Sequence, residues 1–149
     1  MRLWDWALAA YAKPAVAQAC LDLQDAHGQN VPYLLWAAWA AGEGRSADPK
    51  AAARLMRLWD TEVGAPLRGV RRALKPARPA VADTARETLR EAIKGVELHG
   101  ERVLMESLES LSGPAGPPCP LLEALLVAAA ASGDPPRRAA LEHLADALS

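Results

Sequence analysis

The sequence contains no phenylalanine, and isoleucine occurs only once, at Ile93. Apolar residues make up 51% of the chain, and most of them are alanine or leucine. β-Branched and aromatic residues favour strands, whereas alanine and leucine lose little conformational freedom on entering a helix. A β-rich domain is therefore disfavoured, and the composition predicts an all-α fold.

Cysteine is scarce as well. Cys20 and Cys119 are too few and too far apart to indicate a disulfide framework or a zinc site. The N-terminal segment lacks the charged, apolar and small-residue order of a signal peptide, because Asp5 and Tyr11 interrupt it. We therefore expect two reduced thiols and a cytoplasmic location.

Neither a long apolar run nor a large net charge is present. The longest apolar run, Val31 to Ala41, is far shorter than the ~18 residues that suggest a membrane span. The formal net charge is −1, so no global field attracts an anionic membrane or a nucleic acid. We expect no membrane partner, and the charge balance disfavours nucleic acid.

Apolar periodicity, cap residues and prolines predict a series of helices. They run from Leu3 to Ala12, from Pro14 to the stop at His27-Gly28, from the Asn30 cap to about Ala41, from Pro49 to a kink or a restart at Gly64 and Pro66, from Pro66 to Lys75, from Val81 to Leu111, from Leu121 to Ala131 and from Arg137 to Leu148. We expect a compact multi-helix bundle with one short kinked helix pair.

Two of these helices define the expected core. The helix after Asn30 has no polar face, which is typical of a helix buried on all sides. The long helix carries a stripe at spacings of three and four that we expect to be its packing face: Val81, Ala85, Leu89, Ile93 or Ala92, Val96, Gly100, Val103, Ser107 and Leu111.

The predicted domain organisation places a helical core domain at residues 1–111, a proline- and glycine-rich linker at 112–120, and a helical tail at 121–149. Because the proline-rich linker makes the tail separable, we expect the tail to pack only weakly on the core. Self-association through its alanine-rich helices is one possible role, so a homo-oligomer is a possible assembly.

A basic stripe follows the predicted kink. Arg68, Arg71, Arg72 and Lys75 fall at i, i+3, i+4 and i+7, and residues 66–79 contain no acid. The stripe can bind a phosphate or an acidic partner, since arginine matches such groups well. Alternatively, an antiparallel hairpin pairs it with the glutamates of the long helix at 87, 91, 97 and 101.

Trp4 and Trp6 form the second candidate surface. They lie 200° apart on a helix, so both cannot face one core. We expect at least one of them to be partly exposed, or to be covered by a partner or by the tail. Exposed tryptophan is enriched at the energetic centres of protein interfaces.

A polar cluster precedes Gly28 and forms a candidate pocket. Asp22, Asp25 and His27 stand near the end of a predicted helix, where they can act as acid and base or remain solvated, with His27 at the negative end of the helix dipole. With Trp36 and Arg71 they outline a site between the aromatic N-terminal helices. No second histidine has ligand spacing, and no nucleophile or phosphate-loop motif occurs, so we predict no catalytic residue, metal or cofactor.

Several segments together resemble a proteobacterial family of domains of unknown function. The resemblance rests on an opening Leu-Trp-Asp-Trp-Ala-Leu at residues 3–8, on Cys-Leu-Asp-Leu-Gln-Asp-Ala-His-Gly at 20–28, on the basic segment at 66–75 and on Glu101-Arg102-Val103. It covers about the first three quarters of the chain, and Pro32 and the region after Leu111 depart from it. The resemblance implies a small helical protein and supplies no activity.

These observations favour a non-enzymatic protein-interaction or regulatory module. Its expected surface comprises Trp4, Trp6 and the basic stripe at Arg68, Arg71, Arg72 and Lys75. The alternative is a small-molecule binder, or an enzyme, with the pocket at Asp22, Asp25, His27 and Trp36.

Overall fold

The computed structural model describes residues 1–149 and contains only helices and connecting segments, which confirms the all-α prediction. The elements are α1 (Leu3–Tyr11), α2 (Pro14–Asp25), α3 (Val31–Gly42), α4 (Pro49–Trp59), the π-helical segment η1 (Asp60–Gly64), α5 (Ala65–Ala73), α6 (Asp83–Ser110), α7 (Leu121–Ala131) and α8 (Arg138–Leu148). None of the helices is both long and apolar enough to cross a membrane.

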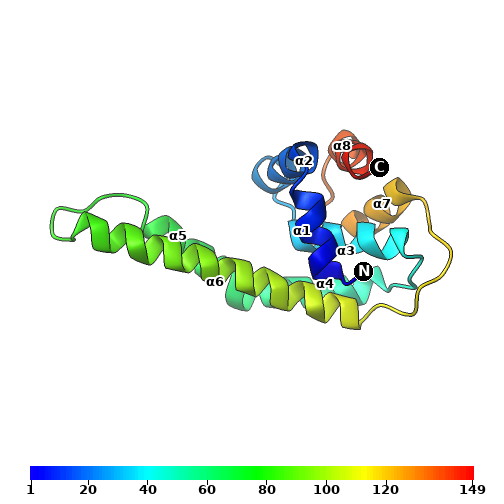
Figure 1. The fold of residues 1–149 in the computed structure, drawn as a ribbon, viewed down its shortest axis with the longest axis horizontal. Coiled ribbons are helices and arrows are strands. Elements are labelled where there is room, and N and C mark those ends of the chain that lie inside the picture. The colour runs from blue at the N-terminus through cyan, green and yellow to red at the C-terminus, as the bar shows by residue number, and fades with distance from the viewer.

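The molecule consists of a globular head and a projecting arm (Figure 1). Helices α1 to α4, α7 and α8 form the head, together with the C-terminal part of α6. Helix α5 and the N-terminal part of α6 run side by side away from the head and are joined by a loop at the far tip. We refer to residues 65–99 as the arm and to the remainder as the head.

Helix α3 is the centre of the head, as its lack of a polar face predicts. Every residue from Val31 to Ala41 is buried. The Asn30 side chain caps the helix by accepting a hydrogen bond from the backbone N–H of Tyr33 at 3.0 Å, and Pro32 lies in the first turn, where no donor is needed. The predicted cap and the predicted burial are both confirmed.

The buried aromatic side chains of α3 connect distant parts of the chain. The Tyr33 hydroxyl donates a hydrogen bond to the carbonyl oxygen of Ala128 in α7 at 2.7 Å. The Trp36 indole N–H donates to Ser112 Oγ at 2.8 Å. The Trp39 indole N–H donates to the carbonyl oxygen of Met1 at 3.0 Å. Each polar group carried into the core therefore has a partner, which avoids the cost of burying an unpaired donor.

The predicted break around Gly64 and Pro66 takes the form of a π-helical segment. Asp48 caps α4 by accepting hydrogen bonds from the N–H groups of residues 50 and 51, and α4 passes through η1 into α5 without an intervening loop. Proline supplies no N–H and crowds the preceding turn, so the hydrogen-bond pattern changes where Pro66 follows.

The predicted packing face of α6 is wrong. Five of its large apolar side chains have exposed fractions between 45% and 50%: Val81, Leu89, Val96, Val103 and Leu111. Only Ile93 and Gly100 of the predicted stripe, besides Ser107, are half-buried. The apolar residues of α6 that are buried lie near its C-terminal end on another side of the helix: Leu104, Met105 and Leu108. The helix carries two apolar faces, and only the shorter one meets the head.

The expectation of a weakly packed tail is also contradicted. Leu125 of α7 and Leu141 and Leu144 of α8 are at most 1% exposed and belong to the same core cluster as α3. Helix α7 packs on α3 and α4, and α8 packs on α2. The small side chains of α7 at Ala128 and Ala129 are buried as well, so they are occupied inside the head.

The linker before α7 is fastened to the head by backbone hydrogen bonds. The N–H groups of Gly113, Gly116 and Cys119 donate to the carbonyl oxygens of Ser46, Glu43 and Ala41 at 2.8, 3.0 and 2.9 Å. Gly44 lies in the left-handed region at φ +61°, and a Cβ there would collide with the carbonyl oxygens of Gly116 and Pro117. The linker is therefore an ordered strap, which is why its prolines do not detach the tail.

Truncating Leu125 tests whether the tail belongs to the core. Leu125→Ala removes a side chain that is 0% exposed, so we expect unfolding free energy to fall by about 2–5 kcal/mol in urea denaturation. Val127→Ala alters the same helix at a position that is 55% exposed and should change it by no more than about 0.5 kcal/mol. Equal effects of the two variants would contradict a shared core.

Gly44→Ala tests the strap. The left-handed backbone alone disfavours alanine by about 1–2 kcal/mol, and the collision with the strap adds to this, so thermal unfolding should begin at a clearly lower temperature. Gly42→Ala is the matched control, because Gly42 lies at the end of α3 with nothing within 4 Å of the added Cβ. A loss of stability in the control as large as in Gly44→Ala would show that the strap is not responsible.

Candidate functional site

Charge is divided between the arm and the head. The arm carries eight cations and four acids, a balance of +4, whereas the rest of the chain carries nine cations and fourteen acids, a balance of −5. The chain as a whole is nearly neutral, but its arm and its head carry net charges of opposite sign. The cationic part is the one that projects into solvent (Figure 1).

Two arginines of the predicted basic stripe are neutralised by ion pairs. Arg68 donates to both carboxylate oxygens of Asp60 at 2.9 and 3.2 Å, passing over Gly64, where a Cβ would lie 2.8 Å from Asp60 Oδ1. Arg71 Nε lies 2.8 Å from one carboxylate oxygen of Glu97 and 3.1 Å from the other. The hairpin alternative is thus correct for Arg71, and Arg68 finds its acid in η1 rather than in α6.

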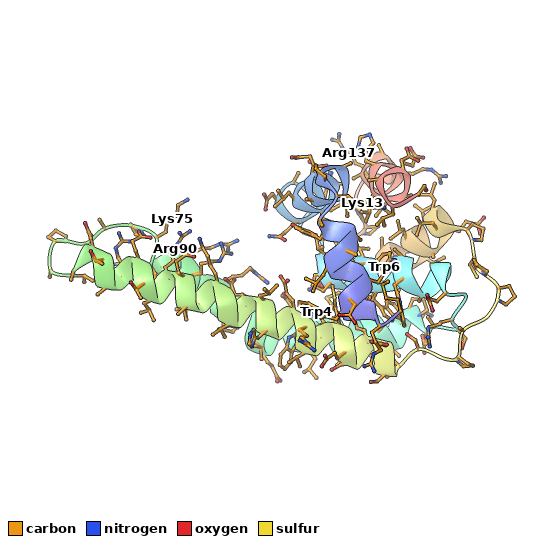
Figure 2. The ribbon with its side chains drawn as sticks, viewed as in Figure 1. Trp4, Trp6, Lys13, Lys75, Arg90 and Arg137 are labelled. Carbon is orange, nitrogen blue, oxygen red and sulfur yellow. The ribbon has the colours of Figure 1, made fainter.

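The other cations of the stripe have no acidic partner. Arg72 and Lys75 are exposed, and the ion pairs of α5 involve only the two arginines described above. In the view of Figure 2, Lys75 and Arg90 lie along the same edge of the arm. The Nε atom of Arg90 is shielded from solvent and has no hydrogen-bond partner. We call Arg72, Lys75 and Arg90 the free cations of the arm, and they give it a basic surface. Arg78 in the loop also has no acidic partner and donates only to the carbonyl oxygen of Pro76.

A buried arginine fixes the tip of the arm. Arg86 is 7% exposed, and its Nη1 donates to the carbonyl oxygens of Leu74 and Lys75 at 2.6 and 2.9 Å. The same nitrogen lies 2.9 Å from a carboxylate oxygen of Glu87. These bonds satisfy carbonyls at the C-terminal end of α5 and hold the loop against α6. The backbone that carries Lys75 is therefore held in place.

A groove of about 780 Å³ lies in the corner between the base of the arm and the head. It is bounded by η1, α5 and α6 on one side, and by the end of α2, the start of α3 and the α7–α8 turn on the other. Trp59 forms part of its wall and donates its indole N–H to the carbonyl oxygen of Gly100 at 3.0 Å. Because π-helical segments often occur at functional sites, the presence of η1 in its wall makes this groove a candidate ligand-binding site.

The groove contains one perturbed carboxyl group. Burial against the groove wall raises the pKa of Glu101 above its ordinary value, the Glu97 carboxylate acts in the same direction, and Arg68 opposes it. Glu101 still reaches the water in the groove, which screens these effects. The hydrogen bond with Asp60 is the main reason why the pKa of Arg68 is raised. The groove thus combines neutral ion pairs with one carboxylate that is easier to protonate than usual.

The predicted pocket residues do not converge. Asp25 and Arg71 line the groove, whereas Asp22 and His27 do not. Instead, His27 Nε2 lies 3.8 Å from Asp22 Oδ2. Trp36 is 1% exposed in the core. No group of three or more histidine, cysteine or acidic side chains is arranged to hold a metal ion.

Trp4 and Trp6 are both partly buried, and both pack against the core cluster. They leave α1 in different directions (Figure 2), as their 200° separation requires. The fully core-facing positions of α1 are instead Leu3, Ala7 and Ala10. The Arg102 guanidinium lies 5.7 Å from the centre of the Trp4 ring, a cation–π contact that covers one side of this tryptophan.

The sequence prediction missed Trp59 and Asp60 as members of a site. The pairing of Asp60 with Arg68 spans eight residues, which are not neighbours on a regular α-helix. The feature of the sequence that could have predicted this pair is the glycine between the two residues, because Gly64 leaves room for the side chains of Asp60 and Arg68 to meet. The signal for Glu101 was its position one helical turn from Glu97, a pairing that disfavours two charges.

A family model with the description "Protein of unknown function (DUF2390)" matches residues 2–108. The match covers the head helices up to α4, the whole arm and most of α6, and it ends before α7. No curated protein and no solved structure matches the chain.

The raised pKa of Glu101 predicts the sign of a pH effect. A carboxyl group whose pKa is higher in the folded chain stabilises the fold below its ordinary pKa of 4.5, and this stabilisation is lost as the pH rises through the raised value. Glu101→Gln stays neutral, so we expect a higher unfolding midpoint than wild type at about pH 7 and a shrinking difference towards about pH 4.

Glu91→Gln is the control on the same helix. The hydrogen bond from Lys94 lowers the pKa of Glu91, so this variant should have an unfolding midpoint at or slightly below that of wild type at neutral pH. Chemical denaturation of the three proteins across this pH range provides the measurement. A lower midpoint for Glu101→Gln than for Glu91→Gln at neutral pH would contradict the assignment.

Proposed function

Because the chain belongs to the DUF2390 family of proteins of unknown function, we propose its function from its structure: a non-enzymatic interaction module of the cytoplasm that binds an acidic protein surface through its arm. The arm holds the cations in a fixed arrangement, and the head anchors the arm. The two free thiols, buried Cys20 and exposed Cys119, accord with a reducing compartment.

The observation that carries the proposal is the projecting basic surface. The free cations of the arm are carried by α5, by α6 and by the loop between them, and Arg86 holds this loop. Long cationic side chains lose conformational entropy on binding, and a fixed backbone reduces the further cost of ordering the segment that carries them. Such a surface suits a partner that brings several carboxylates.

The paired arginines contribute differently from the free ones. Arg68 and Arg71 already have carboxylate partners, so an acidic ligand gains little from them and would have to compete with Asp60 and Glu97. Arg72 and Lys75 have no such competitor. We therefore assign partner binding to the outer half of the basic stripe and a structural role to the inner half. Trp4 and Trp6 lie on the head and are secondary to this surface.

A second candidate function is the binding of a small molecule in the corner groove. The volume of about 780 Å³ is in the range of ligand sites, and the wall combines Trp59 with several charged groups. Of the polar groups proposed for a pocket, Asp25 and Arg71 line this groove, and Arg71 is already paired with Glu97.

Charge reversal at the free cations tests the principal proposal. The double variant Arg72→Glu/Lys75→Glu, used as bait in extracts of the source cells, should recover an acidic partner at least about tenfold less well than wild type. With the purified partner, wild-type affinity should fall as the salt concentration rises.

Lys50→Glu/Arg54→Glu is the matched control, because both residues are exposed cations on α4 of the head and the variant changes the net charge by the same amount. Partner recovery with this control should match wild type. Equal loss with both double variants would contradict an arm-specific site. Disappearance of binding after nuclease treatment would assign the surface to nucleic acid instead and would also contradict the proposal.

A further inference from the structure

One face of α6 is exposed and carries no charge. Leu89, Val96 and Val103 are 50%, 49% and 45% exposed, and they lie seven residues apart along one side of the helix. Ala85, Ala92 and Ser107 lie on the same side, at spacings of three, four or seven from them. We call these six residues the α6 stripe. From Leu89 to Val103 the stripe is about 21 Å long, at 1.5 Å per residue.

The internal contacts of α6 leave Leu89, Val96 and Val103 exposed. Gly100, at the edge of this face, lies against Trp59 and Leu67. Helix α6 meets the head and α5 through other positions, among them buried Leu104 and Leu108 in the head and Glu97, which pairs with Arg71 of α5. A helix facing only water on its outer side normally carries charged residues there. An extended apolar stripe on an exposed helix instead marks a site of association.

The stripe is symmetric about its own centre. Leu89 precedes Val96 by seven residues and Val103 follows it by seven, while Ala85 and Ser107 stand eleven residues before and after it. In a dimer with a two-fold axis, every contact occurs twice: if residue i of the first copy contacts residue j of the second, then residue j of the first copy contacts residue i of the second. An antiparallel pair of α6 helices centred on Val96 fulfils this condition, because Leu89 then meets Val103 and Val96 meets itself.

We propose that the α6 stripe is a homodimer interface in which two copies of this chain pack α6 against α6 in antiparallel orientation about a two-fold axis at Val96.

Charge favours the antiparallel orientation. It lays the cationic arm of each copy, with its balance of +4, along the head of the other, where the balance is −5. A parallel pair would set the two cationic arms side by side. Complementary charges between arm and head fix orientation and register more than affinity.

Small residues let the two helices approach. Gly95 has nothing within 4 Å of an added Cβ, and Ala85 and Ala92 are the smallest side chains of the stripe. A single helix pair is nevertheless smaller than a standard protein interface. We therefore expect a monomer–dimer equilibrium with a dissociation constant on the order of 10 µM.

The mass in solution gives the first test. Sedimentation of the full chain between about 1 and 500 µM should show a shift from one chain of 15.8 kDa to two. Val96→Glu places two carboxylates on the axis and should remain monomeric throughout. Val70→Glu makes the same change on α5, outside the stripe, at a residue that is 44% exposed, and it should dimerise as wild type does. Circular dichroism of each variant confirms that it is folded.

Disulfide trapping gives the orientation. In a Cys119→Ser background, Val96→Cys should form a disulfide between two copies, because the two Cβ atoms meet at the axis. Leu89→Cys alone should not, but Leu89→Cys mixed with Val103→Cys should. Arg72→Glu/Lys75→Glu should keep the dimer, so this test is independent of the acidic partner. Wild type that stays monomeric throughout, dimerisation that survives Val96→Glu, or Leu89→Cys linking to itself as readily as Val96→Cys would each overturn the proposal.

Discussion

The complete burial of α3 is the constraint on which the head depends. A helix without a polar face must be covered on every side, and its three buried donors, on Tyr33, Trp36 and Trp39, must find acceptors. The acceptors come from the α7 backbone, from Ser112 in the strap and from the N-terminal residue. Segments at both ends of the chain are therefore required to complete the core. This requirement explains why the tail is packed although prolines precede it.

The burial of α3 also explains why the arm projects from the head. Once α1, α2, α4, α7 and the C-terminal part of α6 cover α3, helix α5 and the first half of α6 have no core to join. They are held to each other by polar contacts, chiefly Arg71 with Glu97 and Arg86 with the carbonyls of the loop. Holding the hairpin together uses some cations and leaves others free. The division between paired and free cations is thus a consequence of how the arm is stabilised.

Local signals in the sequence were sufficient for some features and not for others. The Asn30 cap, the burial of α3 and the start of a helix at Pro49 each depend on residues within a few positions, and these predictions are confirmed. Where a kink or a restart was predicted, at Gly64 and Pro66, the helix continues through a π-helical segment. The covered face of α6 and the packing of the tail depend on which elements come together in space. Periodicity identifies both apolar faces of α6 equally well. It carries no information on which face meets the head, and the bond from Trp36 to Ser112 crosses a separation of 76 residues.

The two surfaces of the arm lie on different helices, and this separation has a consequence for binding. The exposed side chains of the α6 stripe lie on a different side of α6 from Glu97, which pairs with Arg71 of α5, whereas the free cations Arg72 and Lys75 are carried by α5 and its loop. Pairing along α6 would leave these cations accessible. Because the antiparallel pair points its two arms in opposite directions, a dimer presents two separate basic surfaces rather than one doubled patch. A partner with two acidic segments would then bind through both, and the second contact would be intramolecular and correspondingly favoured.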